Sequence, residues 1–150
     1  MVRFPAEEHQ LKPIPDTNLW IGNAGDAQNL QEIRSLEIRA IFLLAYEEPI
    51  FSYPRDLLVV RIPLLDGSEN DDFNLEITVR SLISLIRNDV NTLVTCSMGM
   101  SRSPVIVSAA LAIHHSLPFD DVLTSVCKSI PTDVSPEFYR YVRSVFEKLI

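Results

Sequence analysis

The 150-residue sequence predicts one α/β domain with a central, mostly parallel, twisted sheet and helices on both faces. Two observations predict this class. Several short apolar runs show no alternation with polar residues, which is typical of strands buried on both faces. Longer segments between these runs carry apolar residues at helical spacing. Because 47% of the residues are hydrophobic and 22% are charged, the chain has the composition of a globular protein with a sizeable core.

The chain divides into a short arm, residues 1–16, and a domain, residues 17–150. The arm contains three prolines and mixed charge, so we expect an extended segment that either covers the domain or is loose. In the domain we expect short apolar strands over residues 18–22, 39–45, 57–63 and 91–95. We expect helices over residues 26–36, 73–88, 104–115, 119–128 and 135–150. Pro104 then occupies the first turn of its helix, where no backbone donor is missed.

Charge and composition exclude several function classes. The formal net charge of −7 argues against a general nucleic-acid or membrane-surface binder, although it permits a local anion site. The longest apolar stretches, 40–46 and 105–113, fall short of the ~20 residues that a membrane helix needs. The acidic N-terminus predicts no signal peptide. Two cysteines and three scattered histidines show no zinc-binding spacing, and free thiols suit a reducing, cytoplasmic setting.

The most informative segment follows the last predicted strand and reads Cys96-Ser97-Met98-Gly99-Met100-Ser101-Arg102-Ser103. A loop wound before a helix N-terminus turns backbone N–H groups inward, where they and the helix dipole bind an anion. Gly99 permits the tight turn, and Arg102 offers a planar fork for two phosphate oxygens. Positive surroundings favour the thiolate of Cys96, which is the nucleophilic form. The segment therefore predicts a nucleophile and an oxyanion clamp around one phosphate-sized site.

This order of strand, cysteine, glycine-containing loop, Arg-Ser and apolar helix resembles the active-site loop of the cysteine-dependent protein phosphatases. The closest likeness is to the small dual-specificity phosphatases, which usually read His-Cys-x-x-Gly-x-Ser-Arg-Ser. The segment NLWIG at residues 18–22 is similar to the family's opening strand, and Leu64-Leu65-Asp66 lies where the family carries its general-acid loop. The resemblance extends over residues 17–150 and implies the protein tyrosine phosphatase fold.

The resemblance also implies a reaction in two steps without a metal or other cofactor. Cys96 attacks the phosphorus to form a cysteinyl-phosphate, while Asp66 protonates the leaving oxygen and later deprotonates the attacking water. Arg102 and the N–H groups of residues 97–102 stabilise the equatorial oxygens. Ser103 donates to the Cys96 sulfur and assists its departure. The implied partners are a phosphoprotein or phosphopeptide substrate, phosphorylated on tyrosine, serine or threonine, and anions such as phosphate, sulfate or vanadate.

Two features leave alternatives open in the sequence. Asp66 precedes Gly67 in what is also an ordinary turn, so Asp71 and Asp72 are alternative general acids. Thr95 stands where the family has a histidine that organises the loop. Its hydroxyl can still hydrogen-bond the loop, but we expect a smaller thiolate fraction and lower activity. The alternative function is therefore a weak or inactive phosphate-binding pseudophosphatase.

Other enzyme classes fit the residues less well. Sulfur transfer on a rhodanese-like loop does not explain Asp66 or the Ser103-Pro104 helix entry. An RNA 5′-phosphatase is expected to present basic residues around its site, which the acidic balance does not supply. The loop also lacks the lysines that meet several phosphates in inositol-phospholipid phosphatases, so we expect monophosphorylated substrates. Cys127 lies among apolar residues at helical spacing and is expected to fill the core.

Overall fold

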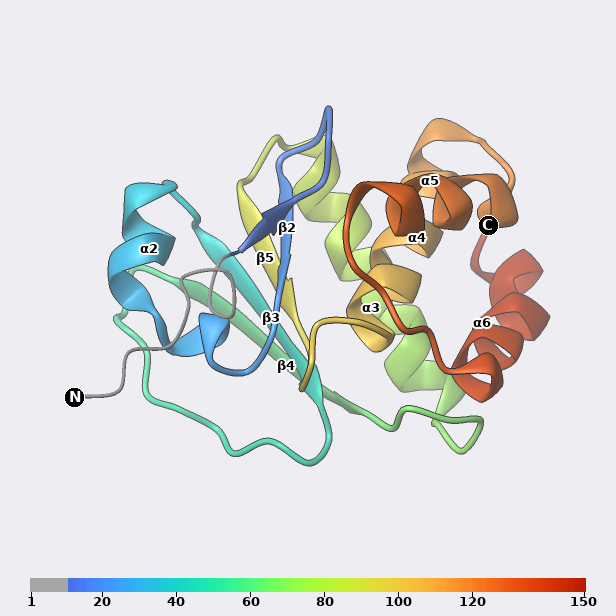
Figure 1. Ribbon diagram of the computed structural model, residues 1–150, viewed down its shortest axis with the longest axis horizontal. Coiled ribbons are helices and arrows are strands. Elements are labelled where there is room, and N and C mark those ends of the chain that lie inside the picture. The colour runs from blue at the N-terminus through green and yellow to red at the C-terminus, as the bar shows by residue number, and fades with distance from the viewer. Residues whose placement is uncertain (1–10) are drawn as a thin grey trace.

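Helices cover both faces of one mixed sheet in the computed structural model, which describes residues 11–150 (Figure 1). Within these residues the sheet has five strands, in the spatial order β1 (Lys12–Pro13), β2 (Leu19–Gly22), β5 (Thr92–Thr95), β3 (Ala40–Ala45) and β4 (Leu58–Leu64). Neighbouring strands are parallel throughout, except that β1 pairs with β2 in the antiparallel sense. The predicted α/β class and the mostly parallel sheet are therefore confirmed.

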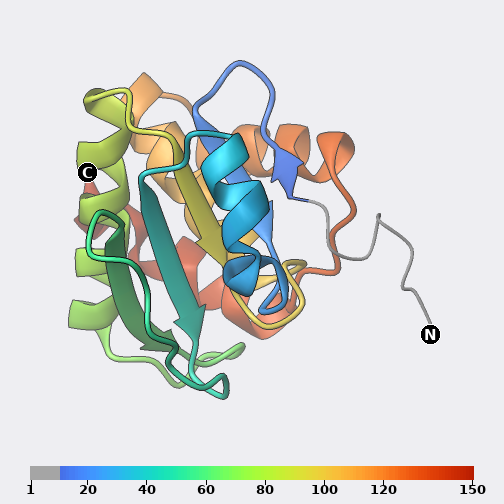
Figure 2. The same cartoon turned by 90° about the vertical axis from the view of Figure 1, so that its left-hand side faces the viewer.

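The helices form two unequal layers. Figure 2 shows α2 (Leu30–Ser35) in front of the sheet, and the other helices lie behind it. Those four helices are α3 (Asp72–Arg87), α4 (Arg102–His115), α5 (Phe119–Ser129) and α6 (Pro136–Leu149). The centre of this layer is α4, whose residues from Arg102 to Ala112 are all buried. No helix within residues 11–150 combines the length and hydropathy that crossing a bilayer requires.

Burial of both sheet faces explains the apolar runs without alternation. In β3, Ile41 packs with Ile33 and Leu93 in the smaller core beneath α2. The next residue, Phe42, points to the opposite face and joins the larger core beneath α3 to α6. Successive side chains of a strand point to opposite faces, so a strand covered on both sides needs apolar residues at every position.

The helix predicted over residues 26–36 is divided in the structure. A short 3-10 turn, η1 (Asp26–Gln28), comes first, and α2 starts only at Leu30. The break occurs because the Asn29 side chain accepts a hydrogen bond from the N–H of Glu32 at 3.2 Å and caps a new helix.

The helix that follows the 96–102 loop, α4, begins at Arg102, two residues before the predicted start at residue 104.

The described part of the predicted arm lies against the domain. Lys12 and Pro13 pair with Ile21 and Trp20, which places β1 at the edge of the sheet. A proline is tolerated there because an edge strand need not donate every N–H to a neighbour. Leu11 is buried as well. Residues 11–13 therefore cover the sheet edge, whereas the first ten residues of the predicted arm lie outside the described part of the chain.

The parallel strands bring several loops to one edge of the sheet. Gly22 of β2, Leu43 of β3 and Thr95 of β5 lie side by side in register. The loops that follow β2, β3, β4 and β5 therefore leave the sheet at the same edge, at the bottom of Figure 1. In open α/β sheets this carboxyl edge is where ligands commonly bind.

Candidate active site

The loop of residues 96–102 lies at this carboxyl edge, between β5 and the first turn of α4. Cys96 directly follows β5 and is 3% exposed, and Arg102 opens α4 and is 4% exposed. A charged side chain is rarely buried to this extent unless it is paired. The structure therefore brings the predicted nucleophile and the predicted anion ligand to the two ends of one short loop, and both residues are buried.

Gly99 fixes the shape of the 96–102 loop through its contact with the end of β2. Its φ of +72° lies in the left-handed region, and a Cβ atom there would come within 2.7 Å of the carbonyl oxygen of Gly22. Next to this contact, the N–H of Ala24 donates to the carbonyl oxygen of Ser97 at 3.0 Å. The loop is thus held against residues 22–24 at a distance that only glycine permits.

The backbone N–H groups of this loop are not consumed by the protein. In the described part of the chain, none of the N–H groups of residues 97–102 donates a hydrogen bond to another residue. Ser101 is the N-cap residue of α4, yet its hydroxyl makes no capping bond to the helix. The donors of the loop and of the first helical turn are therefore free for an anion, and the helix dipole adds to their positive potential.

Arg102 is held by an acidic residue that the sequence did not single out. Its Nη1 and Nη2 donate to the two carboxylate oxygens of Glu47 at 2.7 and 2.6 Å, and Nη1 also donates to the carbonyl oxygen of Leu64 at 2.8 Å. Burial lowers the pKa of Arg102. That pKa is nevertheless raised overall, because two effects outweigh burial: the hydrogen bonds to Glu47, and the negative charges of Cys96, Glu47 and Asp66. The guanidinium therefore stays charged beside Cys96.

Asp66 is joined to the 96–102 loop by the hydroxyl of Ser101. This hydroxyl donates to Oδ1 of Asp66 at 2.7 Å and accepts from the N–H of Ser135 at 2.8 Å. The Ser135 hydroxyl in turn donates to the carbonyl oxygen of Asp66 at 3.2 Å. The two serines thus hold the Asp66 segment over the loop, and they explain why the cap hydroxyl of α4 is not used for capping.

The alternative general acids lie elsewhere. Asp71 is the N-cap of α3 and accepts from the N–H of Phe73 at 2.9 Å. Asp72 accepts from the hydroxyl of Tyr141 at 2.6 Å, which ties it to α6. The structure therefore brings Asp66, and neither of these two carboxylates, into hydrogen-bond contact with the 96–102 loop.

Two contacts that the sequence allows are absent in the structure. The hydroxyl of Thr95 donates to the carbonyl oxygen of Phe42 on β3 at 2.8 Å, so it bridges two strands and does not bond the loop. The hydroxyl of Ser103 is buried and has no hydrogen-bond partner among residues 11–150, so the expected donation to the Cys96 sulfur is not formed. A buried hydroxyl without a partner is costly, which makes this position unusual.

Sequence reasoning missed two glutamates that follow β3. Besides Glu47, which binds Arg102, Glu48 accepts from the hydroxyl of Ser97 at 2.7 Å. The pair therefore contacts the 96–102 loop near both of its ends. One signal was available in the sequence: two acids follow a buried strand after a single intervening residue, and such positions lie at the carboxyl edge where the loop was expected.

The loop's methionines face outward. The exposed fractions are 70% for Met98 and 36% for Met100. The Met100 carbonyl oxygen also accepts from the N–H of Asp133 at 2.9 Å, which ties the loop to the segment before α6. Neither methionine side chain is therefore part of the core.

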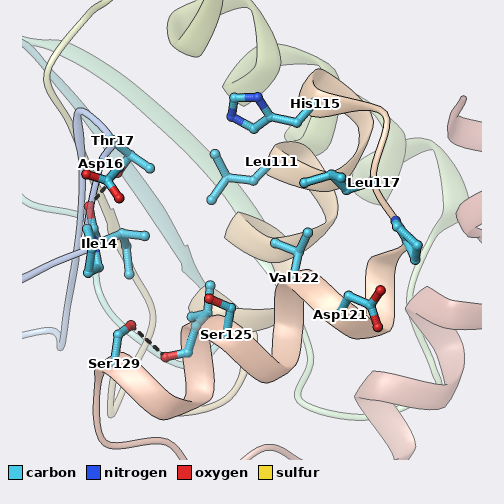
Figure 3. A pocket seen from close by; sticks show the side chains of 13 residues that line it. Ile14, Asp16, Thr17, Leu111, His115, Leu117, Asp121, Val122, Ser125 and Ser129 are labelled. Carbon is cyan, nitrogen blue, oxygen red and sulfur yellow. Dashed lines mark hydrogen bonds between the residues drawn. The ribbon is translucent and has the colours of Figure 1, made fainter.

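A separate pocket lies near the amino end of β2, at the edge of the sheet opposite the 96–102 loop. Figure 3 shows this pocket from close by. It has a volume of about 350 Å³ and opens between the turn that precedes β2, which contributes Ile14 and Thr17, and helices α4 and α5, which contribute Leu111 and Val122. None of the predicted site residues lines it. The predicted site at the 96–102 loop therefore does not include this pocket.

The chain is similar to known phosphatases in sequence and in fold. No family model matches the chain. Dual specificity protein phosphatase 1B of Arabidopsis thaliana is 31% identical over 112 residues, which cover 72% of this chain and 65% of the plant protein. The chain thus spans slightly less than two thirds of that relative's length.

Solved structures extend the likeness to nearly the whole chain. A mouse putative dual specificity phosphatase, complexed with zinc tungstate, has a TM-score of 0.82 at 21% identity and covers 99% of this chain and 94% of its own. The chain has the dual-specificity phosphatase fold. DUSP15 gives a TM-score of 0.78 at 23% identity, with 92% of this chain and 88% of that one covered. The resemblance to small dual-specificity phosphatases and the phosphatase-like fold predicted from the sequence are confirmed.

Proposed function

We propose that the chain is a cysteine-dependent phosphomonoester hydrolase of the dual-specificity type. The observation that carries this proposal is the convergence of Cys96, the free N–H groups of residues 97–102 and the buried Arg102 guanidinium on one phosphate-sized loop. Such donors stabilise the negative charge on phosphoryl oxygens, while the thiolate provides the nucleophile. The plant relative, named as a dual specificity protein phosphatase, supports the same activity.

In the first step, the Cys96 thiolate forms a bond to phosphorus as the bond from phosphorus to the substrate oxygen breaks. Asp66, protonated, gives its proton to that leaving oxygen, and the product is a cysteinyl-phosphate. The hydrogen bond from Ser101 orients the Asp66 carboxyl group over the loop. Arg102 and the N–H groups of the loop hold the three equatorial oxygens throughout.

In the second step, a water molecule attacks the phosphorus and transfers a proton to the Asp66 carboxylate. The sulfur–phosphorus bond breaks, and Cys96 leaves as a thiolate beside inorganic phosphate. The role proposed for Ser103 belongs here. Its buried hydroxyl has no partner in the described chain, so rotation toward the sulfur would satisfy it as negative charge develops there. This step regenerates both the nucleophile and the acid.

The proposed substrates are phosphoproteins or phosphopeptides with phosphotyrosine, phosphoserine or phosphothreonine. The exposed methionines of the loop offer an apolar rim to a substrate side chain. The loop also carries no lysine, which favours a single phosphoryl group over a polyphosphorylated headgroup. Both cysteines are free, as a reducing cytoplasm requires, and we propose that setting for the enzyme.

The test is hydrolysis of a small aryl phosphate by the purified protein in the presence of EDTA. We expect turnover that vanadate inhibits, that Cys96→Ser abolishes, and that Asp66→Asn reduces strongly near neutral pH. Cys127→Ser is the matched control, because it removes the other free thiol, in α5, away from the loop. A Cys96→Ser variant with wild-type turnover would rule out the proposed nucleophile.

A phosphate-binding pseudophosphatase is the second candidate. It is favoured by Thr95, which replaces the family's histidine and hydrogen-bonds β3 instead of the loop. This candidate predicts that the folded wild-type protein binds phosphate or a phosphopeptide without hydrolysing the aryl phosphate. Turnover that depends on Cys96 would exclude it.

A further inference from the structure

We propose that Glu47 is a positioning residue, which holds the Arg102 guanidinium so that its Nε–Nη2 edge faces the phosphoryl group of the substrate. The proposal rests on the phosphate site described above and assigns a second carboxylate to it. Glu47 belongs to the connection that follows β3, not to the 96–102 loop or the Asp66 segment. Its role is separate from acid catalysis, because its carboxylate is committed to Arg102.

The hydrogen bonds of the guanidinium determine which donors remain. An arginine side chain has five N–H donors. Both hydrogens of Nη1 are used, one by Oε1 of Glu47 and the other by the carbonyl oxygen of Leu64. One hydrogen of Nη2 is used by Oε2 of Glu47. The donors that remain are the Nε–H and the second hydrogen of Nη2, which point in the same direction from one edge of the planar group.

These remaining donors match what a phosphoryl group needs. Two parallel N–H donors on one edge bind two oxygens of a phosphate in the bidentate arrangement. The Nε atom is buried and has no partner within residues 11–150. A buried donor without an acceptor is costly in a folded protein, and bound phosphate would satisfy it. Glu47 and Leu64 thus occupy the end of the guanidinium and leave its side edge for the substrate.

The charges around Arg102 support a stable pairing with Glu47 at neutral pH. The hydrogen bonds from Arg102 hold the pKa of Glu47 below its ordinary value, although burial opposes this shift. Glu47 is therefore ionised at neutral pH and remains an acceptor for both Nη atoms. Its side chain is 50% exposed, whereas that of Arg102 is 5% exposed, so the carboxylate lies toward solvent and the guanidinium lies within.

If Glu47 competed with the substrate for Arg102, its removal would change the anion affinity in the opposite direction. If its carboxylate occupied the place of the phosphoryl oxygens, it would compete with substrate, and its removal would tighten anion binding. If it positions Arg102, its removal frees the guanidinium to rotate and weakens anion binding. The direction of one affinity change therefore separates positioning from competition.

The experiment measures tungstate binding by isothermal titration calorimetry on the wild-type protein and on Glu47→Gln. Glutamine keeps the size of the side chain but loses its charge and one acceptor oxygen. We expect tungstate binding to weaken about tenfold, with a parallel rise in KM for an aryl phosphate. Glu76→Gln is the matched control, because Glu76 pairs with Arg80 on the exposed surface of α3 and not at the loop. We expect its tungstate affinity to equal that of the wild type.

A second comparison separates positioning from a loss of stability. In an Arg102→Lys background there is no planar edge to orient, so Glu47→Gln should then change tungstate affinity less than twofold. Tighter or unchanged binding by the single variant, or an equal loss in both backgrounds, would overturn the proposal. Tungstate binding is measured without turnover. A protein that binds tungstate but hydrolyses nothing therefore contradicts the hydrolase proposal, while the effect of Glu47→Gln on tungstate affinity still tests the positioning role.

Discussion

Replacing Gly99 with alanine tests whether the 96–102 loop depends on its close contact with β2. An L-residue at a φ of +72° costs roughly 1–2 kcal/mol. The new Cβ would lie 2.7 Å from the Gly22 carbonyl oxygen, a backbone atom that cannot rotate away, and overpacking of this kind costs about 1–3 kcal/mol. Together we expect a loss of about 2–5 kcal/mol in the free energy of unfolding, or roughly 4–20 °C in Tm for a chain of this length.

Gly67→Ala is the matched control for this substitution. A Cβ atom added at Gly67 would meet no other atom within 4 Å, and its φ is not positive, so alanine there should be neutral or stabilise by up to about 1 kcal/mol. Differential scanning calorimetry gives both Tm values. We also expect Gly99→Ala to lower kcat/KM about a hundredfold, because the displaced loop carries Cys96 and the anion donors. A Tm of Gly99→Ala within about 2 °C of the control would refute the reasoning.

Three further predictions concern single contacts. Ser103→Ala removes a buried hydroxyl without a partner, so it should leave stability unchanged or raise it by about 1 kcal/mol, while slowing cysteinyl-phosphate hydrolysis in pre-steady-state assays. Thr95→Val breaks the bond to the Phe42 carbonyl and should cost about 1 kcal/mol in chemical denaturation with kcat nearly unchanged, since the hydroxyl does not reach the loop. The pKa of Glu47 is lowered in the folded protein, so its pairing with Arg102 stabilises the fold above pH 4.5, the ordinary pKa of glutamate. This stabilisation is lost as the pH falls through the lower pKa that Glu47 has in the folded state. The stability difference between wild type and Glu47→Gln, measured by denaturation from about pH 6 to about pH 3, should therefore shrink toward acid.

The fold was predictable because its signals are local. Buried strands such as β3 show apolar runs, and α3 shows an apolar stripe at helical spacing, so each element is visible in a short window. The 96–102 loop was predictable for the same reason, since Cys96, Gly99 and Arg102 lie within seven residues. The break before α2 was missed because a single capping side chain, Asn29, decides it.

The remaining parts of the site depend on contacts between distant residues. Glu47 and Arg102 are 55 positions apart, and Ser101 and Asp66 are 35 apart. Neither pair forms a sequence pattern, because each contact exists only after parallel strands bring their carboxyl ends together. The contact of Asp66, and not of Asp71 or Asp72, with the loop likewise depends on the folded arrangement and could not be read from the sequence.

The most direct test of the central claim is to trap the proposed cysteinyl-phosphate. Ser103→Ala is mixed with a radiolabelled phosphopeptide, the reaction is quenched with acid within one turnover, and the labelled site is mapped by mass spectrometry. The mechanism predicts a phosphoryl group on Cys96, formed at the rate of the first step and absent from the Cys96→Ser variant. Turnover with no phosphoryl group on the protein, or with the group on another residue, would contradict it.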